Sequence, residues 1–183
     1  MMRAFLAVDL DEKLVDKIVE VQGQLGKAEA LVKFVEPENL HLTFKFFGDI
    51  SREKRDEIIA LVNEKLEKYE PFELSIKKTG VFPHLGYMRV IWLGVENLEA
   101  FSTLQKDLDE DFARMGFKKE RSYIPHLTIG RVKGSKNKEA LISTIRELED
   151  VEIGKMLVKK VTLKKSELTP AGPIYTDVKE FKL

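Results

Sequence analysis

Along the chain, short runs of hydrophobic residues alternate with longer segments in which hydrophobic positions recur every three or four residues. The short runs, rich in β-branched and aromatic residues, predict buried strands. These predicted strands cover residues 3–10, 31–35, 40–47, 72–79, 89–95, 124–131, 156–168 and 174–183. The segments of helical periodicity predict helices at residues 12–25, 52–69, 98–115 and 138–148. The predicted N-caps of the second and third helices are Ser51 and Asn97, and the predicted ends of the first and third are Gly26 and Gly116.

The order of these elements repeats along the chain. Each half reads strand, helix, strand, helix, strand, and the run Arg89–Val95 follows the similar run Arg3–Val8 by 86 residues. No segment rich in Gly, Ser or Pro separates the halves. We therefore predict an α+β fold of one domain with two internally duplicated lobes, each a β-sheet backed by helices, and a central cleft between the lobes. The domain spans residues 1–183, with pseudo-repeats at approximately 3–80 and 89–168 and a C-terminal strand at 174–183.

One four-residue pattern occurs in both halves. The segment His41-Leu42-Thr43-Phe44 returns as His126-Leu127-Thr128-Ile129, and His126 follows His41 by 85 residues. Side chains alternate between the faces of a strand, so each motif presents an imidazole and a hydroxyl on one face, roughly 6.5–7 Å apart, with apolar residues behind. If the two lobes bring these strands together, the four polar groups can surround one phosphate.

Paired histidines suit proton transfer during displacement at phosphorus. A neutral histidine can take a proton from the attacking hydroxyl or water, and a protonated histidine can give one to the departing oxygen. Histidine serves both roles because its ordinary pKa lies near 6.5, and threonine hydroxyls can donate hydrogen bonds to the phosphate oxygens. A site with two histidine ligands to a metal is the lesser alternative, because the sequence offers no evident third ligand.

Composition restricts the partners and the chemistry. Lys+Arg and Asp+Glu are equal at 31 each, so positive charge for RNA binding would have to be gathered in one groove. The absence of cysteine excludes disulfides, thiolate catalysis and thiolate zinc sites. No window approaches the roughly 18 apolar residues of a membrane span, and the apolar N-terminal run, closed by Asp9, is too short for a signal peptide. A cytoplasmic protein without membrane contact is expected.

The sequence resembles the two-histidine phosphoesterase superfamily, and within it the RNA 2',3'-cyclic phosphodiesterase family, also named 2'-5' RNA ligase. The resemblance covers nearly the whole chain and includes both His-x-Thr motifs. It rests on Arg3-Ala4-Phe5-Leu6-Ala7-Val8, Asn39–Gly48, Gly80-Val81-Phe82-Pro83, Arg89–Gly94, Pro125–Arg131 and Gly172-Pro173-Ile174-Tyr175.

This resemblance implies metal-independent hydrolysis of an RNA 2',3'-cyclic phosphate to a 2'-phosphate, with no cofactor. By the family's pattern, His126 is the general base that activates water and His41 is the general acid at the 3'-oxygen, with Thr43 and Thr128 at the phosphate. It also implies reversible joining of RNA ends, such as those of tRNA halves, through a 2'-5' linkage. We expect a monomer.

Further residues are candidates for contacts with the substrate. Arg131 can hold the phosphate if Gly130 bends the strand, because strict alternation would turn it away from the cleft. Lys45 shares the parity of His41 and Thr43 and can line the cleft. Just before the second motif, Arg121 and Tyr123 can supply charge and base stacking for a single-stranded RNA end.

Other conspicuous side chains have plainer interpretations. His84 lacks a threonine partner and is read as a surface loop residue, whereas Phe46, Phe47 and Trp92 are predicted to belong to the core. Two alternatives for the function stay open. The same site can act on a small cyclic nucleotide or an ADP-ribose cyclic phosphate, or the cleft can bind RNA ends without catalysis.

Overall fold

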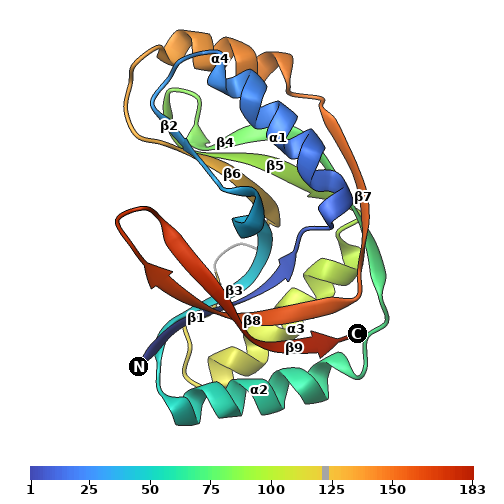
Figure 1. Cartoon of the computed structure of the whole chain (residues 1–183). Helices are drawn as coiled ribbons and strands as arrows, with labels where there is room; N and C mark the ends of the chain where they lie inside the picture. The colour runs from blue at the N-terminus through green and yellow to red at the C-terminus, as the bar shows by residue number, and fades with distance from the viewer. Residues whose placement is uncertain (121–123) are drawn as a thin grey trace.

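A computed structural model describes residues 1–120 and 124–183 of the chain. It has the predicted α+β class, with a curled antiparallel sheet covered on its outer side by helices (Figure 1). The helices of the described residues are α1 (Glu12–Gly26), α2 (Arg52–Leu66), α3 (Glu99–Arg114) and α4 (Lys138–Glu147), with a 3-10 turn at Pro37–Asn39. The strands are β1 (Met2–Asp9), β2 (Val32–Phe34), β3 (His41–Ile50), β4 (Phe72–His84), β5 (Tyr87–Glu96), β6 (His126–Val132), β7 (Glu152–Val158), β8 (Lys160–Leu168) and β9 (Pro173–Lys182).

The sheet has two lobes that meet at its centre. Its strand order is β7-β4-β5-β6-β3-β1-β8-β9, and β2 pairs with β6 beside β3. We call β7-β4-β5-β6 with β2 the β6 lobe, and β3-β1-β8-β9 the β3 lobe. The β6 lobe is backed by α1 and α4 and the β3 lobe by α2 and α3 (Figure 1). Among the described residues, only one pair, Leu42 with Leu127, is in register between β3 and β6, so the lobes join along a very short seam and curve away from it.

The predicted strand at residues 156–168 is wrong, because the extended chain belongs to two strands in different lobes. Strand β7 pairs with β4 at one edge of the sheet, whereas β8 pairs with β1 and β9 in the other lobe. The break falls at Lys159, between the buried Val158 of the β6 lobe and the buried Val161 of the β3 lobe. The two strands look continuous in sequence because the chain stays extended while its neighbours change.

The lobes do not coincide with the halves of the sequence. Strand β4, from the first half, lies between β5 and β7, and β8, from the second half, lies beside β1. Helix α1 follows β1 in sequence but contacts β6, β7 and α4. Each lobe is therefore assembled from both halves of the chain.

Of the two predicted N-caps, one is confirmed and the other is wrong. Ser51 caps α2 as predicted, since its hydroxyl accepts the Lys54 N–H at 3.1 Å. The prediction for Asn97 is wrong, because Leu98 occupies the N-cap position of α3. Asn97 has a φ of 61° and its amide donates to Ser75 Oγ at 3.4 Å. Asparagine tolerates this left-handed conformation, which turns the chain out of β5 and directs the amide toward β4.

The core fills the space between the sheet and its helices. In the β3 lobe, Phe44 stacks on Phe101 of α3 with ring centroids 4.2 Å apart, and Phe47 meets Phe112 edge-on at 4.8 Å. The core prediction for Phe47 is thus confirmed. Among the described helices, none combines the length and the apolar composition needed to cross a bilayer.

Candidate active site

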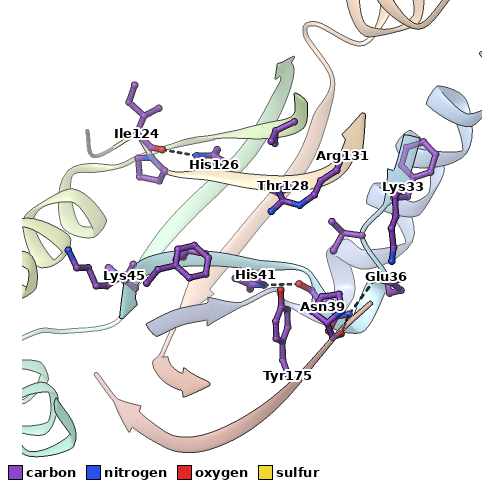
Figure 2. A pocket seen from close by; sticks show the side chains of 18 of the residues that line it. Lys33, Glu36, Asn39, His41, Lys45, Ile124, His126, Thr128, Arg131 and Tyr175 are labelled. Atoms are coloured by element: carbon purple, nitrogen blue, oxygen red, sulfur yellow. Dashed lines mark hydrogen bonds between the residues drawn. The ribbon is translucent and has the colours of Figure 1, made fainter. Parts of the chain in front are cut away.

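The two His-x-Thr motifs lie side by side on the strands that join the lobes. Because Leu42 pairs with Leu127, the antiparallel register sets His41 opposite Thr128 and Thr43 opposite His126. The two histidines are then diagonal neighbours, roughly 7–8 Å apart in a regular pair. All four side chains line one cavity of about 430 Å³, and Figure 2 shows His41, His126 and Thr128 among the residues around it.

The same backbone contact orients both imidazole rings. Nδ1 of His41 lies 2.7 Å from the carbonyl oxygen of Asn39, and Nδ1 of His126 lies 3.0 Å from that of Ile124. A carbonyl oxygen only accepts, so Nδ1 carries the proton and donates in each ring. Nε2 is therefore the nitrogen that carries the lone pair when either ring is neutral.

The rings differ in their surroundings. His41 packs between aromatic rings, with centroid distances of 4.9 Å to Phe5 and 5.4 Å to Tyr175. This burial lowers the pKa of His41, an effect to which the positive charge of Lys164 adds and which the Asn39 carbonyl partly opposes. His126 meets the ring of Phe82 edge-on at 4.9 Å. In the free protein, the neutral form of His41 is thus favoured.

A β-bulge follows each threonine and changes which side chains face the cavity. In β3, Thr43 and Lys45 pair with consecutive residues of β1, so Phe44 is the extra residue. In β6, Thr128 and Gly130 pair with consecutive residues of β5, and Ile129 is the extra residue. A bulge reverses the alternation of the residues beyond it. The residues three positions after each threonine, Phe46 and Arg131, therefore line the cavity.

The bulge in β6 turns Arg131 toward the cavity that contains the two histidines. The sequence predicts this position only if the strand bends at Gly130, and the bulge at the preceding residue has that effect. At the cavity, Arg131 joins two lysines, since Lys33 pairs with it across β2 and β6, and Lys133 also lines the wall. Glu36 lies at the same end (Figure 2). Positive charge is thus gathered in one groove of a chain whose net charge is zero.

Lys45 is among the residues that line the cavity, as predicted, but the bulge in β3 directs its ammonium group toward α3. Its side chain is only 3% exposed, and its ammonium group forms ion pairs with Asp109 at 2.6 Å and Glu120 at 3.2 Å. Nζ also donates to the carbonyl of Lys118. Lys45 therefore joins β3 to α3 and the segment after it, and its charge is already neutralised.

The bulge in β3 also makes the core prediction for Phe46 wrong. This side chain is 62% exposed and lines the cavity, with its ring 5.5 Å from that of Phe5. An exposed aromatic ring beside a phosphate-sized polar centre can stack on a nucleobase. The sequence signal that could have revealed it is the matching position of Arg131, because both stand five residues after a motif histidine.

The remaining candidates lie elsewhere. Arg121 and Tyr123 fall outside the described residues. His84 is exposed at the end of β4, one residue before the turn into β5, so it is a strand end and not the loop predicted. In the part of the chain that the structure describes, no group of three or more His, Asp or Glu side chains is arranged to hold a metal.

The arrangement of two histidines and two threonines around one cavity is accompanied by sequence matches over most of the chain. The family model of the 2'-5' RNA ligase superfamily matches residues 10–169. The chain belongs to this superfamily. Methanothermobacter thermautotrophicus has an RNA 2',3'-cyclic phosphodiesterase that is 59% identical over 181 residues, covering 99% of this chain and 98% of the relative. A relative of the same name from Methanocaldococcus jannaschii is 43% identical and covers 98% of this chain and 100% of its own.

Solved structures of similar proteins have the same fold. A crystal structure of a Thermus thermophilus protein superimposes with a TM-score of 0.86 at 29% identity, covering 100% of this chain and 98% of that one. Escherichia coli LigT complexed with 3'-AMP gives a TM-score of 0.80 at 26% identity, with 100% and 98% coverage. These comparisons confirm the predicted superfamily, the two-lobed α+β fold and the assignment of the chain to a family of enzymes.

Proposed function

We propose that this protein hydrolyses the 2',3'-cyclic phosphate at the end of an RNA strand to a 2'-phosphate, without a metal ion. The observation that carries the proposal is the pair of histidines on adjacent strands, each with Nδ1 bound to a backbone carbonyl and Nε2 left to take or give a proton. The names of the relatives specify the same substrate, and the superfamily supports an RNA partner.

In the proposed mechanism, the two histidines move protons on opposite sides of the phosphorus. Nε2 of His126 takes a proton from water, whose oxygen attacks the phosphorus of the cyclic ester. The bond from phosphorus to the 3'-oxygen breaks, and Nε2 of His41 gives its proton to that oxygen. Thr43 and Thr128 donate hydrogen bonds to the non-bridging oxygens as negative charge grows there. Arg131 holds the same oxygens through its planar guanidinium group.

The substrate itself completes the charge state that this mechanism needs. In the free protein, burial lowers the pKa of His41, which disfavours its protonated form. A bound phosphate places negative charge beside the ring and favours protonation. A histidine whose proton is held weakly is also the stronger acid, which suits donation to an alkoxide leaving group.

The side chains that line the cavity can contact both the base and the phosphates at the end of an RNA strand. Phe46 offers a face for the terminal nucleobase, since every base can stack on an aromatic ring. Lys33 and Lys133, beside Arg131, offer positive charge to the preceding phosphates. With the 5'-hydroxyl of a second RNA strand in place of water, the same proton transfers would form a 2'-5' phosphodiester.

One experiment tests the proposal and its alternatives. The protein is incubated with EDTA and either an oligonucleotide or a mononucleotide that carries a 2',3'-cyclic phosphate. We expect the oligonucleotide to be converted to its 2'-phosphate, and His41→Ala and His126→Ala each to lose about 10²–10⁴-fold in rate. His84→Ala is the matched control and should keep full activity, because His84 is exposed at the turn between β4 and β5.

Each other outcome has a defined meaning. Better turnover of the mononucleotide would identify a small cyclic nucleotide as the substrate. Binding of the oligonucleotide without turnover would identify a module that recognises RNA ends. Loss of activity in EDTA, restored by a divalent ion, would contradict proton transfer between two histidines as the whole mechanism.

A further inference from the structure

A second cavity adjoins the first and shares His126 with it. Its volume is about 410 Å³, and it lies along β4 and β5 and reaches the end of α4. Besides His126, the two cavities share Ile124 and Pro125. Ile124 and His126 stand at the opposite end of the first cavity from Arg131 and Lys33 (Figure 2). The second cavity therefore opens on the side of His126 that faces away from the basic groups.

The rings of Trp92 and Phe82 form the floor of this cavity, and the Trp92 ring packs over Gly80. Trp92 lies flat on β4, and a Cβ atom added at Gly80 would come within 2.2 Å of Cζ2 of its ring. Phe82 bridges the indole and the imidazole, at 5.3 Å from Trp92 and 4.9 Å from His126. Gly94 pairs with His126 across β5 and β6, so no side chain there fills the space beside the imidazole. Such a surface is suited to a nucleobase.

The charged groups that line this cavity disfavour binding of a phosphate group. Glu149 and Asp150, in the turn that follows α4, are exposed, line the wall and form no ion pair within residues 1–120 and 124–183. The two lysines of the wall are occupied, since Lys77 and Lys78 both pair with Glu96, at 2.7 and 3.5 Å. Carboxylates accept hydrogen bonds from hydroxyl and amino groups, whereas a phosphate placed beside them would be repelled.

We propose that this second cavity binds the nucleoside at the 5'-hydroxyl end of an RNA strand, which is the acceptor for 2'-5' joining. The proposal rests on the proposed function, because it needs the cyclic phosphate between His41 and His126. An aromatic floor, a carboxylate wall and an adjoining general base select a nucleoside that carries no 5'-phosphate. In the reverse direction, the same cavity holds the leaving nucleoside when a 2'-5' linkage is cleaved.

The joining step balances without a further reactant. The 5'-oxygen of the acceptor attacks phosphorus, and its proton passes to Nε2 of His126. The bond from phosphorus to the 3'-oxygen breaks, and that oxygen takes the proton of His41. One bond to phosphorus forms and one breaks, and each histidine ends in the other's starting protonation state.

Binding in this cavity can be followed directly, because Trp92 is the only tryptophan of the chain. The first cavity is filled with adenosine 2'-monophosphate, and adenosine or adenosine 5'-monophosphate is then titrated while the indole emission is recorded. We expect adenosine to quench the emission and the 5'-monophosphate to need about tenfold higher concentration, because its phosphate meets the carboxylates. In Glu149→Gln, Asp150→Asn protein the difference should shrink. Equal quenching by both ligands, or none, would overturn the proposal.

A functional test separates joining from hydrolysis. In Glu149→Lys, Asp150→Lys protein, we expect the KM for a 5'-hydroxyl acceptor to change by about tenfold, whereas hydrolysis of the cyclic phosphate keeps its rate. Glu20→Lys, an exposed carboxylate of α1, is the matched control and should change neither. Loss of hydrolysis in wild-type protein would defeat the proposed function. Intact hydrolysis with joining unaffected by the double variant would defeat only the acceptor site.

Discussion

At the scale of single residues, both histidines make the same hydrogen bond from Nδ1 to a backbone carbonyl, but their other neighbours differ. His41 is held between Phe5 and Tyr175, and its pKa is lowered by burial. His126 stands where two cavities meet and touches the ring of Phe82. A pair of identical residues thus becomes a chemically unequal pair, which is what an acid and a base in one reaction require.

The lowered pKa of His41 leads to a prediction about pH. In the free protein, NMR titration of its ring protons should give a pKa below the ordinary value of 6.5, because desolvation penalises the imidazolium form. A pKa above 6.5 in the free protein would contradict the effect of burial.

The same shift makes stability depend on pH. A histidine whose pKa is lower in the folded than in the unfolded protein binds its proton more readily after unfolding. The contribution of His41 is therefore fully present above pH 6.5 and is lost as the pH falls through the folded-state pKa. His41→Gln should lose less stability than wild-type protein between pH 7.5 and 5, as measured by urea unfolding.

Lys45 carries a charge that is costly to remove. In Lys45→Met, the ammonium group that neutralises the buried Asp109 carboxylate is lost, and we expect a loss of about 3–5 kcal/mol in the free energy of unfolding. Glu120→Gln is the matched control, because Glu120 is 42% exposed and a surface pair contributes about 0–1 kcal/mol. Equal effects of the two changes in urea unfolding would show that the Lys45–Asp109 pair is not what holds this region.

At the scale of strands, alternation predicts the shared face of His41 and Thr43 and of His126 and Thr128, and it fails just beyond each motif. The bulges at Phe44 and Ile129 reverse the faces of the residues that follow. Nothing in either motif indicates an extra residue, because both bulged side chains are apolar and buried, as simple alternation also predicts for them. Bulges are set by pairing with another strand, so one strand's sequence does not contain them.

Glycine in strand β4 offers a test of how the aromatic floor is built. Gly80→Ala puts a Cβ atom into the ring of Trp92, so we expect a loss of about 1–3 kcal/mol in unfolding free energy and a changed indole emission. Gly23→Ala, at an exposed position of α1 with open space around it, should instead stabilise by about 0.5–1 kcal/mol. If Gly80→Ala were as well tolerated as Gly23→Ala, the indole could not lie flat on β4.

At the scale of the whole molecule, the motif spacing predicts that distant segments meet, but not how the halves are interleaved. Two apolar strands that follow each other can pair together or join different parts of one sheet with the same sequence pattern. This is why the sequence predicts one strand where β7 and β8 lie. The choice depends on which strand edges remain open once β1, β3, β4 and β5 have paired, and that is a property of the complete sheet.

The interleaving predicts that neither half of the sequence folds alone. A fragment of residues 1–85 keeps β4 without β5 and β7, and β1 without β8, and a fragment of residues 86–183 has the opposite deficits. We expect each fragment to lack cooperative thermal unfolding by circular dichroism, and an equimolar mixture to regain it together with activity on the cyclic phosphate. A fragment that unfolds cooperatively by itself would contradict this dependence.

The carbonyl groups of Asn39 and Ile124, which accept from the two imidazoles, have an evolutionary consequence. Many enzymes orient a histidine with a carboxylate, and one base change in the gene can delete that carboxylate. Here the orienting group belongs to the peptide backbone, and every amino acid supplies it. Substitutions at positions 39 and 124 can accumulate without removing the hydrogen bond of either ring, so the orientation of the two histidines is protected from point mutation. Only replacement of the amide itself, for example by an ester in a semisynthetic protein, would test its contribution.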